Sequence, residues 1–269
     1  RDFSSNFYNL EYVSTGDIRS KTNWKKILTN IDCIIHCVAK AHETNFFNKE
    51  SLNEFRMVNV EATANLARQA AASGVKRFVF LSSIKVNGEN NINDTIFRHD
   101  DPPNPKDAYG ISKFEAEQEL WKISKQTGIE VVIIRPPLVY GRGVKGNMKR
   151  LIKLINYGIP LPLSLINNKR SLIGIDNLVD IIIRCIDHPN ADGKTFLVSD
   201  DRDLSTPDLL KLIASYMGSS VRLFPLPVTL LKFFSLILGM ESEINKLIGS
   251  LRIDNSLTKE ILNWKPPFN

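Results

Sequence analysis

Short apolar runs that alternate with helical segments restrict the fold of this chain more than any other feature. The runs cover residues 31–38, 77–81 and 129–135, and helical periodicity covers residues 57–72 and 107–126 between them. The runs are apolar at successive positions, which is typical of strands inside a parallel sheet that is covered on both faces. The order strand, helix, strand, helix, strand predicts an α/β fold with a doubly wound parallel sheet and right-handed crossovers.

The pattern changes near residue 141, which indicates two parts. Residues 1–141 carry the alternation, whereas residues 142–269 contain shorter elements and predict a smaller α/β lobe, some segments of which return to the sheet. Sheets of this kind bind ligands beyond the carboxyl ends of their strands. That edge carries residues 39–42, 82–83 and 136–141. We expect a ligand cleft between this edge and the smaller lobe.

Charge and cysteine usage narrow the class of partner. The net charge is +6 and the pI about 9.1, but Lys and Arg are scattered and no nucleic-acid-binding module is present. A phosphorylated small molecule accounts for this charge as well as a nucleic acid does, and we predict no nucleic-acid partner. Cys33, Cys37 and Cys185 lack the spacing of zinc ligands. We therefore expect small buried thiols, no metal, and a reducing, cytoplasmic location.

The longest apolar stretch covers residues 223–240. Pro225, Pro227 and Lys232 interrupt it. It is too interrupted for a membrane-spanning helix, and it predicts a buried or interfacial helix.

Tyr109 and Lys113 are the first candidates for chemistry. If Asp107 opens a helix, the two side chains stand four residues apart on one face. A nearby ammonium favours the phenolate and brings a phenol with a pKa of about 10 toward the working range of an acid or base. Reversible proton transfer to a sugar hydroxyl or ketone requires such a group. The spacing alone is weak, because such pairs occur by chance on many solvated helices.

Ser83 gives this pair a partner. It follows the strand that ends at Leu81, at the sheet edge from which the chain leads into the Tyr109 helix. A hydroxyl there can hold the sugar oxygen in line while Tyr109 removes its proton. The alternative is that Ser82 and Ser83 only satisfy backbone groups in a turn, which is the commoner role of Ser pairs.

With these motifs in this order, the chain resembles the extended short-chain dehydrogenase/reductase family, and within it the nucleotide-sugar epimerases, dehydratases and reductases. The resemblance spans nearly the whole chain and rests on residues 16–18, 36–42, 58–60, 81–88, 109–113, 135–141 and 262–266. It implies a Rossmann-like sheet in residues 1–141 that binds NAD or NADP, and a nucleotide-sugar-binding lobe in residues 142–269.

The resemblance also implies roles for single residues. The catalytic residues are Ser83, Tyr109 and Lys113, and Lys113 also grips the nicotinamide ribose. Asn59 supports the loop backbone near the site, unless it is simply a helical Asn that faces solvent. The remaining cofactor positions are Asp17 and Ile18 at the adenine, Val38, Ala39 and Lys40 along the diphosphate and ribose, and Pro136 and Leu138 near the nicotinamide.

The nucleotide-sugar would contact residues on both parts of the chain. Asn147 opens a helix at a position that binds the diphosphate in the family, although it is equally ordinary as a helix cap. Arg170 and Arg252 are candidates to clamp the diphosphate, with surface charge as the alternative. Ser83 and Lys85 complete the substrate residues. Ile84 and Lys85 replace the acidic pair of the dehydratases, so we do not expect dehydration.

The front of the chain departs from the family. A Rossmann fold needs a Gly-rich turn after its first strand, where the pyrophosphate approaches backbone amides. Gly16 is the only glycine before residue 74. The first βα unit is therefore missing from the sequence as given, which predicts weak or no dinucleotide binding by this polypeptide and binding by a longer parent.

These features leave three functions open. The leading one is an NAD(P)-dependent UDP-sugar 4-epimerase of surface polysaccharide synthesis, acting on UDP-glucose or a UDP-N-acetylhexosamine. The second is a nucleotide-sugar 4-ketoreductase. The third is a non-catalytic binding or assembly protein of the same fold. The resemblance implies a homodimer formed through helices.

Overall fold

A four-stranded parallel sheet forms the centre of the molecule. The computed structural model describes residues 11–41, 49–91, 95–144 and 146–268. The strands lie in the order β1 (Cys33–His36), β2 (Arg77–Leu81), β3 (Glu130–Arg135) and β6 (Lys194–Leu197), and all three pairings are parallel. The structure confirms the predicted α/β fold with a parallel sheet. β6 comes from the part beyond residue 142 and returns to the sheet, as expected.

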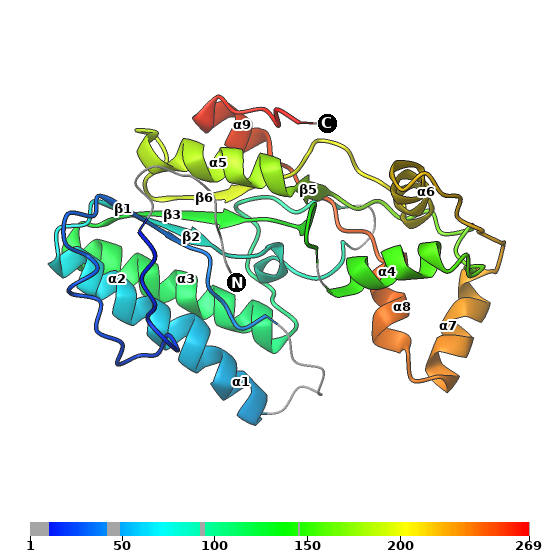
Figure 1. Ribbon diagram of the computed structural model, residues 1–269, viewed down its shortest axis with the longest axis horizontal. Helices are drawn as coiled ribbons and strands as arrows, with labels where there is room; N and C mark the ends of the chain where they lie inside the picture. Colours follow the sequence, from blue (N-terminus) through cyan, green and yellow to red (C-terminus); the bar gives the residue numbers. More distant parts are fainter. Residues whose placement is uncertain (1–10, 42–48, 92–94, 145, 269) are drawn as a thin grey trace.

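Helices cover both faces of the sheet (Figure 1). α2 (Ala62–Ala72) and α3 (Ala108–Thr127) lie on one face, and α5 (Ile175–Asp187) and α9 (Ser256–Leu262) lie on the other. Side chains of β3 alternate between two cores, because Val131 and Ile133 pack toward α2 and α3 while Val132 and Ile134 pack toward α5. Burial on both faces explains why these strands are continuously apolar.

α3 begins and ends at the predicted signals. The Asp107 carboxylate accepts a hydrogen bond from the Gly110 amide at 2.7 Å, and Gly128 ends the helix at φ +78°. Gly110 is required by its surroundings, since a Cβ there would lie 2.9 Å from the Lys85 carbonyl oxygen. The start of α3 can therefore approach η2, a 3-10 helix over Ile84–Val86.

Two helix predictions differ from the structure. The helix expected over residues 57–72 is preceded by α1 (Lys49–Arg56), and its first turn is η1, a π-helix over Met57–Glu61. The sequence of residues 23–30 also predicts a short helix, and this prediction is wrong. That segment forms turns, in which the amides of Ile27 and Leu28 both donate to the Trp24 carbonyl. Buried Trp24 and Leu28 hold the turns against the core without a helix.

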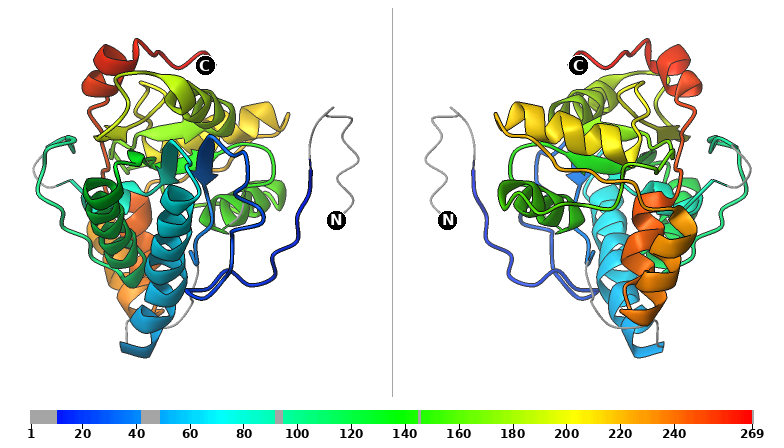
Figure 2. Two further views of the ribbon diagram at one scale, coloured as in Figure 1. Left: turned by 90° about the vertical axis from the view of Figure 1, so that its left-hand side faces the viewer. Right: turned by 90° about the vertical axis from the view of Figure 1, so that its right-hand side faces the viewer.

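The smaller lobe has a core of its own. α4 (Gly146–Asn156), α6 (Thr206–Tyr216), α7 (Val228–Ile237) and α8 (Glu241–Ile248) pack together at the end of the molecule away from β1 (Figures 1 and 2). β4 (Leu138–Tyr140) and β5 (Leu172–Gly174) form a separate two-stranded parallel sheet between the lobe and the central sheet.

Within the described ranges, no helix is long and apolar enough to cross a membrane, and no three His, Cys, Asp or Glu side chains cluster in a way that could hold a metal ion. The expectation of buried thiols is met by Cys185 and is wrong for Cys37, which is exposed. Cys37 follows β1, which is an edge strand of the described sheet. No further described strand therefore covers one side of this segment.

Candidate active site

Ser83 and Tyr109 meet at the carboxyl end of β2. β2 stops at Leu81, and the chain then turns through Ser82 and Ser83 into η2, against which the start of α3 packs. The Ser83 hydroxyl lies close enough to the Tyr109 phenol to act against the rise of the Tyr109 pKa. The same hydroxyl accepts a hydrogen bond from the Lys85 amide at 3.3 Å. The turn role, treated above as the alternative, is therefore present, and the role of Ser83 toward a sugar oxygen stays a prediction.

The pKa of Tyr109 differs from the expectation. Burial raises the pKa of Tyr109 to about 12, the Asp107 carboxylate adds to the rise, and the Ser83 hydrogen bond opposes it. The predicted lowering by Lys113 is wrong for the protein without bound cofactor. The physical reason is the direction of the ammonium, since Lys113 Nζ donates to the Leu81 carbonyl at 2.7 Å and lies 4.4 Å from the centroid of the Phe80 ring.

Lys113 is almost fully buried, and its environment controls its charge. Burial lowers the pKa of Lys113 to about 8, while the charges of Glu117 and Cys37 oppose the shift. His36 lies nearby on β1, and burial together with the Lys113 charge lowers the pKa of His36 to about 4. His36 is therefore neutral at physiological pH, and its Nε2 pairs with the Thr63 hydroxyl at 2.9 Å.

Asn59 holds the loop that follows β1. Its carboxamide accepts from the Lys40 amide at 2.8 Å and donates to the Lys40 carbonyl at 3.0 Å and to Ser112 Oγ at 2.9 Å. Ser112 Oγ donates in turn to the Tyr109 carbonyl at 2.8 Å. These bonds confirm the predicted support of the loop backbone. The solvent-facing alternative is wrong, because Asn59 is 1% exposed.

A buried polar network under the site was missed by the sequence reasoning. Glu117, one turn beyond Lys113 on α3, binds the Arg135 guanidinium through both oxygens and accepts from Ser82 Oγ at 2.5 Å. Arg135 also donates to Asn87 Oδ1 at 2.9 Å. A signal was present, since Arg135 ends an apolar strand and Glu117 continues the spacing of Tyr109 and Lys113 by a further four residues.

Lys85 is bound to two carboxylates. Its ammonium contacts Asp107 and, at 3.1 Å, Glu89. Burial acts to lower the pKa of Lys85, but the charges and hydrogen bonds of Asp107 and Glu89 outweigh it and the pKa rises. Lys85 thus connects η2 to the N-terminus of α3. Its role toward the substrate stays a prediction.

The two candidate arginines lie close in the fold but have different partners. Arg170 bridges to Leu251, the neighbour of Arg252, along the backbone. The Arg170 Nη1 donates to the Lys246 and Gly249 carbonyls at 2.7 and 3.0 Å, and burial lowers its pKa. Arg252 Nε donates to Asp203 at 2.8 Å. Arg170 therefore stabilises the end of α8, and a diphosphate clamp by either residue stays a prediction. Asn147 lies in the first turn of α4, at the predicted helix start.

The predicted cofactor residues have different surroundings. Val38 and Leu138 are 44% and 42% exposed beyond the ends of β1 and β3, whereas Pro136 is buried and its carbonyl accepts from the Ile84 amide at 3.0 Å. Ala39 is half-buried. At the front, Asp17 is exposed and paired with Arg19 at 3.0 Å, and Ile18 packs against the core. The exposed apolar side chains at the strand ends are available to a flat ring.

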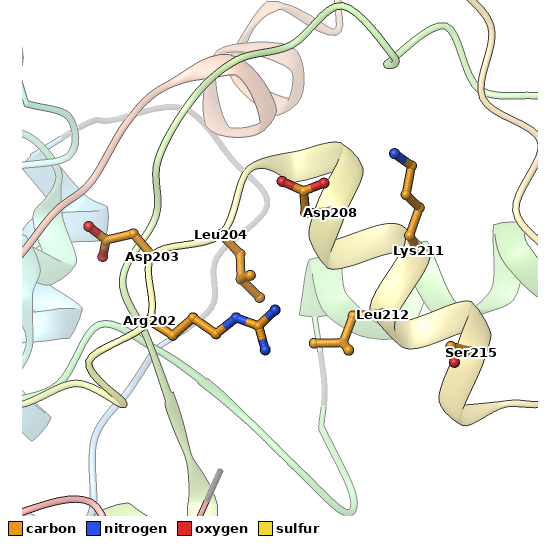
Figure 3. A pocket seen from close by; sticks show the side chains of 7 residues that line it. All are labelled: Arg202, Asp203, Leu204, Asp208, Lys211, Leu212 and Ser215. Carbon is orange, nitrogen blue, oxygen red and sulfur yellow. The ribbon is translucent and has the colours of Figure 1, made fainter.

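A shallow pocket of about 480 Å³ opens on the smaller lobe, beside α6 (Figure 3). Sequence reasoning did not find it, because its polar groups come from a loop and a helix without a motif. It adjoins Arg252 through the shared Asp203 contact. Its lining is of mixed charge and consists of Arg202, Asp203, Leu204, Asp208, Lys211, Leu212 and Ser215.

Comparison with known proteins identifies the family. Residues 1–199 match the NAD dependent epimerase/dehydratase family. The chain is 46% identical over 253 residues to UDP-glucose 4-epimerase from Vibrio cholerae, covering 94% of this chain and 77% of that protein. It is 26% identical to N-acetyl-alpha-D-glucosaminyl-diphospho-ditrans,octacis-undecaprenol 4-epimerase from Escherichia coli O157:H7, over 84% of this chain and 66% of that protein.

Solved structures agree on the fold. UDP-glucuronic acid 4-epimerase from Bacillus cereus, in complex with NAD, superimposes with a TM-score of 0.74 at 20% identity, covering 94% of this chain and 75% of that one. The extent of the family match and the identity to the Vibrio cholerae protein together assign this chain to the NAD dependent epimerase/dehydratase family.

Proposed function

We propose that this chain is an NAD-dependent UDP-sugar 4-epimerase that interconverts the C4 epimers of UDP-glucose or of a UDP-N-acetylhexosamine. The observation that carries the proposal is the placement of the Ser83 hydroxyl beside the Tyr109 phenol, at the end of β2 where the buried Lys113 ammonium is also held. The 46% identity to a UDP-glucose 4-epimerase supports this choice of reaction. NADP in place of NAD stays open.

The residues at the strand ends fit the nicotinamide half of the cofactor. Lys113 presents a buried cation there, and the exposed Val38 and Leu138 offer apolar contacts to a ring. The pyrophosphate half is different, because residues 11–41 contain a single glycine, Gly16, and no Gly-rich turn. When bound, oxidised nicotinamide supplies a hydride acceptor and a positive charge that favours the Tyr109 phenolate.

Side chains of this protein then carry out the proton transfer. Ser83 donates a hydrogen bond to the C4 oxygen of the sugar and holds it beside Tyr109. Tyr109 would take the proton of the C4 hydroxyl as the hydride leaves C4. It would return a proton to the C4 oxygen as the hydride comes back to the opposite face of the rotated 4-keto sugar. Since its pKa is about 12 without cofactor, Tyr109 is protonated in the resting protein. Lys113 supplies positive charge beside the nicotinamide ribose and orients that ribose.

The test of this proposal is the product balance. UDP-glucose supplied with NAD should give UDP-galactose, which chromatography detects. No net NADH should form, which is checked by absorbance. Net NAD(P)H consumption by a 4-keto sugar would assign the ketoreductase reaction instead. If the protein with bound cofactor turns over neither UDP-glucose nor a 4-keto sugar, both enzymatic functions are refuted. The non-catalytic binding or assembly function then remains.

A homodimer formed through helices rests on the family resemblance alone and is checked by light scattering. A cytoplasmic location stays a prediction.

A further inference from the structure

α7 exposes an apolar surface. Its buried side chains are Leu231 and Ser235, four residues apart, and Val228 packs against the same core, while five large apolar side chains of the helix and two that follow it are exposed. Leu236 and Ile237 are each 65% exposed. We call this set the α7 apolar surface; it consists of Leu230, Phe233, Phe234, Leu236, Ile237, Leu238 and Met240. Soluble proteins seldom expose so many neighbouring apolar residues without a binding partner.

The size of the helix limits what can cover it. α7 has ten residues, so it is about 15 Å long, half the thickness of a hydrocarbon core. It can lie on a bilayer but cannot cross one. Lys232 is the one charged residue of α7, and a lysine can reach the lipid headgroups while the helix body is buried.

Much of the sequence that builds this lobe is basic and free of acidic residues. Two stretches that build this lobe, residues 142–169 and 209–240, contain no Asp or Glu. They carry nine cations, namely Arg142, Lys145, Lys149, Arg150, Lys153, Lys169, Lys211, Arg222 and Lys232. On α4, which shares a core with α7, Lys149, Arg150 and Lys153 are exposed. α4 and α7 lie at the same end of the molecule (Figure 2).

The combination of exposed apolar side chains with nearby cations favours one of two binding partners for the α7 apolar surface, a second copy of the chain or an anionic lipid surface. A second copy of the chain would cover the apolar side chains, but it would also bring the basic stretches of two copies toward one another. An anionic lipid surface satisfies both features, because it accepts apolar side chains below the headgroups and attracts each nearby Lys or Arg. Glu241 and Glu243, at the start of α8, mark the end of the favourable region.

We propose that the α7 apolar surface and the cations of α4 dock this protein on an anionic membrane surface, with α7 lying in the plane of the headgroups. The binding is peripheral and salt-sensitive. It places the smaller lobe at the membrane and leaves the sheet with its Ser83 and Tyr109 edge outside it. This docking is independent of the reaction proposed above.

Sedimentation with vesicles tests the proposal. The wild-type chain should pellet with phosphatidylcholine vesicles that contain phosphatidylglycerol, should pellet far less with phosphatidylcholine alone, and should be released by added salt. Phe233→Ser/Ile237→Ser should lower the partition coefficient at least about tenfold, because both side chains lie at the centre of the exposed face. Its matched control, Val179→Ser/Ile183→Ser on α5, removes two side chains that are 46% and 58% exposed and should leave binding unchanged.

A charge pair tests the second feature. Lys149→Glu/Lys153→Glu on α4 should weaken binding to the anionic vesicles, whereas Lys25→Glu/Lys26→Glu makes the same change of net charge far from α7 and should have little effect. Thermal melting verifies that each variant folds. Absence of wild-type binding, or binding that ignores both the α7 and the α4 substitutions, overturns the proposal. A dimer that dissociates in Phe233→Ser/Ile237→Ser without any lipid binding assigns the surface to a second copy and also overturns it.

Discussion

The Glu117 carboxylate and the Arg135 guanidinium form a two-pronged ion pair in the core, with Nε to Oε1 at 2.9 Å and Nη2 to Oε2 at 2.5 Å. Their side chains are 2% and 7% exposed. The pair joins α3 to the end of β3, one helical turn from Lys113. The ion pair therefore fixes the position of α3 along β3. This in turn sets where Tyr109, on α3, lies relative to Ser83, which follows the neighbouring strand β2.

Breaking this pair should be costly. Arg135→Met leaves the Glu117 charge buried without its partner, and we expect the free energy of unfolding to fall by about 3–5 kcal/mol in urea denaturation. The control is Arg68→Met, which breaks an exposed pair with Glu119 and should cost at most about 1 kcal/mol. Equal losses in the two variants would show that the buried pair does not organise α3.

Removal of the Asn59 carboxamide should loosen the loop after β1. Asn59→Ala deletes three hydrogen bonds, two of them to the Lys40 backbone, which should cost about 1–3 kcal/mol of stability and raise the KM for the cofactor more than it lowers kcat. Asn65→Ala, which removes a carboxamide that donates to the Thr22 carbonyl at 2.8 Å, is the matched control and should leave KM unchanged. A lower kcat at constant KM would contradict this account.

His36 should make stability depend on pH. Burial lowers its pKa from 6.5 to about 4 in the folded protein, so the unfolded chain binds the extra proton between these values. Stability is then fully present above pH 6.5 and falls by about 3 kcal/mol as the pH drops toward 4. His36→Asn should reduce this slope in urea titrations across the range, and His99→Asn, whose side chain is 42% exposed, should not. An unchanged slope in His36→Asn would assign the effect to other groups.

Local sequence patterns predicted the structural features that are determined by residues close together in the sequence. β2 and the caps of α3 at Asp107 and Gly128 follow directly from apolar runs and capping residues. The approach of Ser83 to Tyr109 was also predictable, because strand ends in a parallel sheet share one edge. Such features need no knowledge of what packs on them.

Features that depend on the tertiary environment were not predictable. The sign of the Tyr109 pKa shift is set by burial and by the carbonyl that draws Lys113 away, and neither is visible in the spacing of two residues. The π-helical turn that buries Asn59 has no sequence signal. The sequence indicated Arg170 as a candidate diphosphate clamp, with surface charge as the alternative. It did not reveal the carbonyls that Arg170 binds at the end of α8, which lie about 80 residues further along the chain.

Cofactor affinity should depend on a Gly-rich turn whose backbone amides the pyrophosphate can approach. Residues 11–41 provide only Gly16, so calorimetric titration of this polypeptide with NAD should show weak or no binding. The same chain fused to a Gly-rich βα unit should bind NAD more tightly. Unchanged or lower affinity after the fusion would contradict this dependence on a Gly-rich turn.

The most direct measurement is turnover of UDP-glucose by Tyr109→Phe, in whichever polypeptide the NAD titration shows to bind cofactor. Phe keeps the ring and its edge contact with Phe55 at 6.4 Å but removes the proton-carrying oxygen. We predict that kcat falls by about 100-fold to 10,000-fold while NAD affinity and thermal stability stay near wild type. Tyr157→Phe, at an exposed tyrosine, should keep full activity. A Tyr109→Phe variant with kcat within a few fold of wild type would show that another group moves the proton.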